Sequence, residues 1–190
     1  NGVKTQHIII PDVEIELGKV TGHDRDDKFG RVKSIDNADG GVDIWAFADD
    51  TASPRASLKT FQTTASTIYL TSSSASDTAV TVTMGYIDAN GDDQTVTGIA
   101  LTGQTPVSTG VTGLDVNRFF VDGDTSAVGV IYATAGNDLS GGTPNDVTDV
   151  MAVAPAGYNQ AQLSHFTVPK GCTLLMRDLF ISVSRNAGGI

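Results

Sequence analysis

The stretch TAVTVTMGYIDANGDDQTVTGIAL, residues 78–101, decides the fold class of this 190-residue chain. From Val80 to Met84 the large apolar residues stand at every second position with threonine between them, which is typical of a half-buried strand. The pair Asn90-Gly91 accepts the positive φ of a tight turn, and residues 94–101 then read as a return strand. The stretch therefore predicts an antiparallel hairpin centred on Asn90-Gly91.

The same pattern extends along the chain from Val42 onward. Short runs of Val, Ile, Thr, Tyr and Phe are separated by clusters of Gly, Asn, Asp and Ser, which is typical of many strands joined by tight turns. We expect further strands at residues 13–17, 43–47, 66–71, 105–111, 116–121, 128–133, 147–153, 161–168 and 173–184. No segment sustains the apolar spacing of an amphipathic helix. These observations predict an all-β fold, an antiparallel β-sandwich or jelly-roll-like domain over residues 42–190.

Residues 1–41 differ from this domain in composition. Most of the chain's 12 Lys and Arg residues precede Thr60, and the run His23-Asp24-Arg25-Asp26-Asp27-Lys28 mixes both signs of charge. Apolar residues are few between residues 18 and 41, so this segment cannot bury a core of its own. We expect an N-terminal strand followed by an extended N-terminal arm that precedes the β domain.

The overall composition argues against several classes of partner. A formal net charge of -10 and a pI near 4.4 disfavour binding to nucleic-acid phosphates and to anionic lipids, so we expect no nucleic acid and no membrane as a partner. The start of the chain lacks the basic and apolar pattern of a signal peptide, so none is expected. The single cysteine, Cys172, can form no intrachain disulfide, which fits synthesis in a reducing cytoplasm.

Residue patterns that carry chemistry are lacking. His7, His23 and His165 stand far apart in unrelated contexts, so they predict no metal site. Residues 88–93 resemble a calcium loop, but glycine is fourth rather than sixth and the closing Glu is missing, which favours a plain turn over loose cation binding. No Gly-x-Ser-x-Gly elbow marks a nucleophilic serine. The sequence therefore predicts no catalytic residue, no cofactor and no enzymatic activity.

Three further features have structural interpretations. Cys172 is expected to be a small buried residue rather than a nucleophile, because it has no neighbouring histidine or second cysteine. Residues 139–144, with Gly141-Gly142, are expected to form an exposed connection. Trp45 is flanked by Ile44 and Phe47, and an anchor in a core or interface is favoured there over a sugar-stacking platform.

Several short sequence motifs, here called words, occur in a set order along the chain. They are Asp27-Lys28-Phe29-Gly30-Arg31, Ser34-Ile35-Asp36, Asp43-Ile44-Trp45, residues 72–78, residues 101–107, Val116-Asn117-Arg118 and residues 167–171. In these words the chain resembles a family of tailed-bacteriophage virion structural proteins, and it departs from the family pattern in the acidic residues 46–50. The resemblance implies a particle component without chemistry of its own: a capsid decoration or cement protein, a head fibre, or a tail-associated protein.

The resemblance also implies partners and a location. A decoration protein is made in the host bacterial cytoplasm, lies on the capsid surface of the virion, and binds the major capsid protein or other virion proteins. We expect a homo-oligomer, with a trimer as the first guess. The predicted partner-binding residues, which supply charge-assisted hydrogen bonds and apolar anchors, are Arg25, Lys28, Phe29, Arg31, Lys33 and Trp45.

Two other interpretations stay open. One is a tail- or fibre-associated adaptor or a glycan- or receptor-binding module, in which Tyr86 or Tyr158 would stack on sugar. The other is a particle-borne polysaccharide hydrolase, for which no acid and base pair is recognisable.

Overall fold

The computed structural model describes residues 21–22, 28, 60–123, 125–161, 163–176 and 179–181. Within them the chain is all-β, and its single helical element is a short 3-10 helix, Val147–Asp149. The strands are β1 (Ser66–Ser72), β2 (Thr81–Asp88), β3 (Asp93–Ala100), β4 (Val107–Val121), β5 (Ile131–Thr134), β6 (Leu139–Ser140), β7 (Thr143–Pro144) and β8 (Val150–Ala154). Nowhere in this described part does a helix have the length and hydropathy needed to cross a bilayer.

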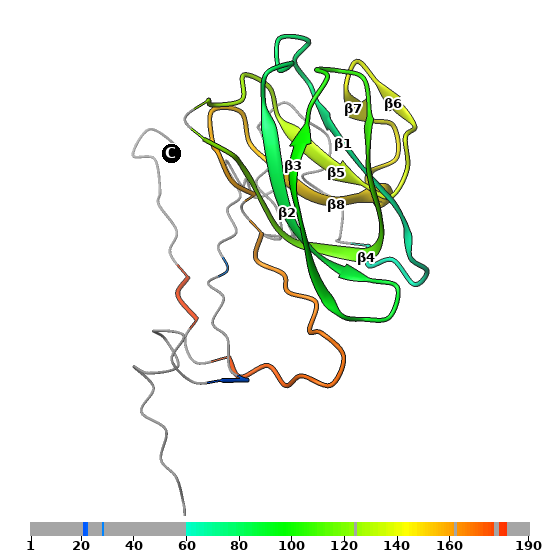
Figure 1. Cartoon of the computed structure of the whole chain (residues 1–190), viewed down its shortest axis with the longest axis vertical. Helices are drawn as coiled ribbons and strands as arrows, with labels where there is room; N and C mark the ends of the chain where they lie inside the picture. The colour runs from blue at the N-terminus through cyan, green and yellow to red at the C-terminus, as the bar shows by residue number, and fades with distance from the viewer. Residues whose placement is uncertain are drawn as a thin grey trace, which may run out of the picture.

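Six of the strands form one antiparallel sheet in the order β3-β2-β4-β1-β5-β8, and β6 pairs with β7 in a small separate hairpin. The sheet curls, so that β4 contacts β8 in addition to its paired neighbours β1 and β2 (Figure 1). This curled sheet confirms the predicted all-β, antiparallel and sandwich-like domain. The predicted N-terminal strand and extended arm lie outside the described residues, apart from residues 21–22 and 28.

The core lies inside the curl. Its largest fully buried side chains include Phe119, Ile68, Leu70 and Met84, and every residue of β8 is buried. In β2 the alternation read from the sequence places Val82 and Met84 in this core, but residues 82–87 are all buried, so the expectation of a half-buried strand is wrong there. Burying a side chain of this size stabilises a fold by about 1.5–3 kcal/mol, so the apolar faces of β1, β2 and β4 hold the sheet in its curled form.

The predicted hairpin at Asn90-Gly91 is confirmed. β2 and β3 pair with Ile87 opposite Asp93, and Gly91 has φ of 86°. The Asp88 carboxylate accepts hydrogen bonds from the backbone N–H groups of Asn90 at 2.8 Å and Asp92 at 3.0 Å, which closes the turn. These bonds, that from Asp92 foremost, hold the pKa of Asp88 below its ordinary value. The plain turn expected at residues 88–93 is therefore confirmed.

The strands expected at residues 105–111 and 116–121 are one strand, β4, of 15 residues. The sequence Thr112-Gly113-Leu114 reads as a break, but Gly113 is the point where β4 passes from β1 to β2 and pairs with Ser66 and Asp88. A Cβ atom at Gly113 would lie 2.8 Å from the carbonyl oxygen of Ile87. The glycine permits close contact between strands here instead of ending the strand.

Two expected strands near the C-terminus are not found. Of residues 161–168, those described form no strand, and the described residues of 173–184 have no sheet partner. Alternating apolar residues form a strand only where a sheet edge is available to pair with them. The expected exposed connection at residues 139–144 is wrong in part, because it contains β6 and β7 and buries Gly142.

Candidate functional site

A β-bulge in the middle of β4 lies at a cluster of buried polar side chains. Gly85 of β2 lies opposite Arg118, whereas the next residue, Tyr86, lies opposite Val116, so Asn117 is an extra residue without a direct partner. A bulge interrupts the hydrogen-bond ladder and redirects side chains. Asn117 and Asp115 are nevertheless only 3% and 1% exposed, so their polar groups need partners from elsewhere in the chain.

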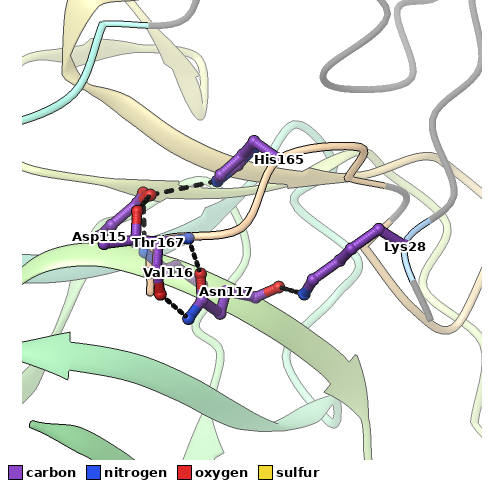
Figure 2. Close-up of polar contacts among 6 residues, drawn as sticks. All are labelled: Lys28, Asp115, Val116, Asn117, His165 and Thr167. Atoms are coloured by element: carbon purple, nitrogen blue, oxygen red, sulfur yellow. Dashed lines mark hydrogen bonds and ion pairs between the residues drawn. The ribbon is translucent and has the colours of Figure 1, made fainter. Parts of the chain in front are cut away.

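Those partners come from residues 165–167. The Asn117 amide donates to the carbonyl oxygen of Thr167 at 2.9 Å and accepts from its backbone N–H at 2.8 Å. The side chain of Asn117 thus makes the two hydrogen bonds that the backbone of a neighbouring strand would make. The Thr167 hydroxyl donates to Asp115 Oδ2 at 2.6 Å, and the Val116 N–H donates to Asp115 Oδ1 at 2.9 Å (Figure 2). The bulge thereby fixes a segment that is 50 residues away in the chain.

His165 completes the cluster. Its Nε2 atom lies 3.3 Å from Asp115 Oδ2, its side chain is 7% exposed, and its ring meets the ring of Phe61 edge to face at 5.8 Å. The arrangement contains the residue types of a Thr-His-Asp triad, but a triad needs the imidazole between the carboxylate and the hydroxyl. Here His165 and Thr167 approach the same carboxylate oxygen. His165 is therefore not placed to remove the Thr167 proton, and the cluster serves to hold chain segments together.

Lys28 lies at the outer side of this cluster. Its Nζ atom donates to the carbonyl oxygen of Asn117, the residue that the bulge removes from the regular ladder (Figure 2). The same atom stands 5.0 Å from the centre of the Phe166 ring. Lys28 was predicted to bind a partner, and the structure places it on the chain's own β domain. The other predicted partner-binding residues, Arg25, Phe29, Arg31, Lys33 and Trp45, lie outside the described residues.

Sequence reasoning did not assign a role to Asp115, Asn117, His165 or Thr167. A signal was present, since Asp115 and Asn117 are polar residues within an otherwise apolar strand pattern, and Asn117 and Thr167 belong to two of the short words. The structure brings those two words into contact.

A second polar cluster surrounds Asp77, which is 2% exposed. Its carboxylate accepts hydrogen bonds from the Ser72 hydroxyl at 2.5 Å and from the backbone N–H groups of Val128 and Gly129, both at 2.9 Å. Burial raises the pKa of Asp77, but these hydrogen bonds outweigh that effect and hold the pKa below its ordinary value. The Asp77 carbonyl also accepts from Gly103, so the words at residues 72–78 and 101–107 meet here.

Three aspartates lie near the 3-10 helix. Burial, followed by the negative charges of Asp146 and Asp138, raises the pKa of Asp149. Asp146 instead caps the helix by accepting from the hydroxyl and N–H of Thr148, and these bonds lower its pKa. In the part of the chain that the structure describes, no group of three or more His, Cys, Asp or Glu side chains is arranged to hold a metal ion.

Two residues differ from their expected environments. Cys172 is exposed, which contradicts the expected burial, because the chain leaves the sheet after the Lys170 N–H bonds to the carbonyl oxygen of Gly91. Tyr86 is 8% exposed and belongs to the core, so it cannot stack on a sugar. Tyr158 is 39% exposed and stays available for that role.

The chain beyond Cys172 exposes a run of large apolar side chains. Leu174, Leu175, Met176, Leu179, Phe180 and Ile181 are between 56% and 91% exposed. The described parts of this stretch lie away from the sheet (Figure 1). Exposed large apolar side chains grouped in this way typically mark a site of protein association.

Comparisons with protein-family models, with curated proteins and with solved structures found no match to this chain.

Proposed function

We propose that the chain is a non-enzymatic structural protein of a tailed-bacteriophage particle, a decoration or cement protein that binds the lattice of the major capsid protein and stabilises the head. The assignment to a phage particle rests on the resemblance of the short words to those of virion structural proteins. The observation that carries the binding role is the exposed apolar stretch at residues 174–181, whose side chains need a covering surface that the described domain does not provide.

The proposed action is thermodynamic stabilisation through binding rather than catalysis. A protein that binds the assembled lattice, but not its separated subunits, stabilises the lattice by mass action against the pressure of packaged DNA. The two polar clusters fit this role, because the carboxylates of Asp77 and Asp115 are engaged in holding chain segments together. In this proposal the apolar stretch and residues 1–41 are the parts of the chain that contact the shell surface.

The direct experiment measures occupancy on empty shells of the phage that encodes the chain. The variant Leu175→Asp/Phe180→Asp places charge in the apolar stretch and should abolish binding to shells. The matched control is Thr95→Asp/Thr97→Asp, which adds the same two charges at exposed positions of the edge strand β3. Full occupancy by the double variant would contradict the binding role of the stretch.

A second measurement concerns the arm. Deletion of residues 1–41 should abolish attachment while the β domain stays folded by circular dichroism. Undiminished occupancy by the truncated chain would remove the arm from the proposal.

The alternative is a glycan- or receptor-binding module of a tail or fibre, and the exposure of Tyr158 is the observation that favours it. This alternative predicts that the purified chain binds cell-surface glycans, that Tyr158→Ala abolishes this binding, and that shells are not bound. Affinity for shells without affinity for glycans would exclude it.

A further inference from the structure

A site for a single ammonium group lies where β4 meets the chain that follows β8. The bulge leaves Asn117 without a direct partner in β2, and its carbonyl oxygen accepts a hydrogen bond from Lys28 Nζ (Figure 2). The same Nζ atom stands 5.0 Å from the centre of the Phe166 ring, a distance at which an aromatic face attracts a cation. The Asn117 carbonyl oxygen and the Phe166 ring are here called the ammonium site.

The two halves of the ammonium site belong to different parts of the chain. Asn117 lies in β4, whereas Phe166 lies in residues 164–172, here called the strap. A group bound between the two halves therefore joins the strap to the sheet. In the structure that group is Lys28, which is 89 residues away from Asn117 in the chain.

The strap has few apolar contacts to hold it in place. None of its residues is a member of the hydrophobic core of the described domain. Hydrogen bonds hold it instead: Thr167 bonds to the side chains of Asp115 and Asn117. Further along, the Lys170 N–H bonds to the tip of the β2–β3 hairpin. Because segments with few buried apolar contacts open at a lower free energy than the core, the strap can leave the sheet without global unfolding.

We propose that the ammonium site binds a primary alkylammonium group, and that Lys28 of the same chain fills it as a clip that keeps the strap on the sheet. When the site is filled, the strap is joined to β4 through Asn117 and Phe166. When the site is empty, the strap leaves the sheet more often by local unfolding. The clip concerns the chain alone, so its test needs no phage particle and does not depend on the function proposed above.

Hydrogen exchange of the full native chain, read by mass spectrometry of its peptides, tests the clip. Lys28→Ala should speed exchange in the strap at least about tenfold, because a cation–π contact and a hydrogen bond from a charged group are lost together. Exchange in β1 and β2 should stay unchanged, which also shows that the domain is folded. The matched control is Lys170→Ala, which removes the same charge from an exposed position of the strap and keeps the backbone bond to the hairpin. This control should leave exchange in the strap unchanged.

Chemical rescue tests the class of ligand. Added n-butylammonium chloride should restore slow exchange in the strap of Lys28→Ala, because it carries the ammonium group and the methylene chain of the lost side chain. Sodium chloride at the same concentration should not do so. Phe166→Leu combined with Lys28→Ala should abolish the rescue, because leucine keeps an apolar side chain but has no aromatic face.

Acetylation of the native chain gives a measurement that needs no variant. Lys28 should react more slowly than Lys170, which is exposed on the same strap. Equal reaction rates would show that the site is empty in solution and would overturn the proposal.

Three results of the exchange experiment would also overturn it. The first is exchange in the strap that is equally slow with and without Lys28. The second is an equal effect of Lys170→Ala, which would indicate an effect of net charge. The third is a Lys28→Ala chain that n-butylammonium protects no better than sodium does, which would remove the ammonium site.

Discussion

Replacement of Asp77 by alanine should be among the most destabilising single changes in the described domain that do not create a large cavity. Asp77 is 2% exposed and accepts three hydrogen bonds, from the Ser72 hydroxyl and from the N–H groups of Val128 and Gly129. Each buried donor left without a partner costs about 1–3 kcal/mol. Allowing for some entry of water, we expect a loss of about 3–5 kcal/mol, a large part of the 5–15 kcal/mol typical of a folded protein.

The assay is urea unfolding at pH 7 followed by far-UV circular dichroism, with the free energy of unfolding compared between variants. The control is Asp92→Ala, which also removes one negative charge but lies exposed in the hairpin turn. This control should change the free energy of unfolding by less than about 0.5 kcal/mol. A loss below about 1 kcal/mol for Asp77→Ala would refute the structural role of this cluster.

The variant Asp77→Asn tests the contribution of the negative charge of Asp77, through the dependence of stability on pH. The folded-state pKa of Asp77 is lowered, so its ionised form contributes stability that is fully present above the unfolded-state pKa of about 3.9. That contribution is lost as pH falls through the lower folded-state pKa. The asparagine variant has no such titration, so the difference in stability between it and the native chain should shrink as pH falls below about 3.9. A difference that stays constant with pH would contradict the proposed charge-assisted bonds.

Two other outcomes are expected. Gly142→Ala should lower the free energy of unfolding by about 2–5 kcal/mol, because the position has φ of 77° and a Cβ atom would lie near the carbonyl oxygen of Ser72. The control Gly157→Ala has φ of 74° and open space around it, so it should lower the free energy of unfolding by only about 1–2 kcal/mol in the same assay. Asp149→Asn should raise the stability at pH 7, because an acid whose folded-state pKa is raised destabilises the fold when it ionises. This gain in stability should vanish as pH falls below about 3.9. A variant that is equally stabilised at pH 3 would contradict this account.

Part of the fold could be predicted because its causes are local. The hairpin of β2 and β3 depends on alternation with a period of two and on a glycine at the turn, and both are visible within residues 78–101. β1 was expected at residues 66–71 and is found at Ser66–Ser72 for the same reason. β4 was divided wrongly because a glycine such as Gly113 is typical of turns. Its actual role, to permit close contact between strands, depends on Ile87, a residue in another strand.

The candidate site could not be predicted, because it is made of residues that are distant in the chain. Asn117 and Thr167 are 50 residues apart, and Lys28 is 89 residues from Asn117. Their contact depends on the extra residue that the register of β2 against β4 creates at Asn117, and register follows from the packing of the whole sheet. Lys28 was selected from the sequence as a binding residue, but the surface that it contacts became visible only in the folded chain.

The sequence by itself determined an acidic, all-β chain with a charge-dense N-terminal segment, because composition and short-range alternation specify strand content and net charge without regard to the partners of each strand. Only the tertiary structure decided which polar residues are buried together, and that the apolar residues at 174–181 stay exposed while those of β8 are covered. Both stretches are rich in large apolar residues, although Arg177 and Asp178 interrupt the second one. They differ because burial depends on whether a strand finds a neighbour in the sheet, and that is a property of the whole fold.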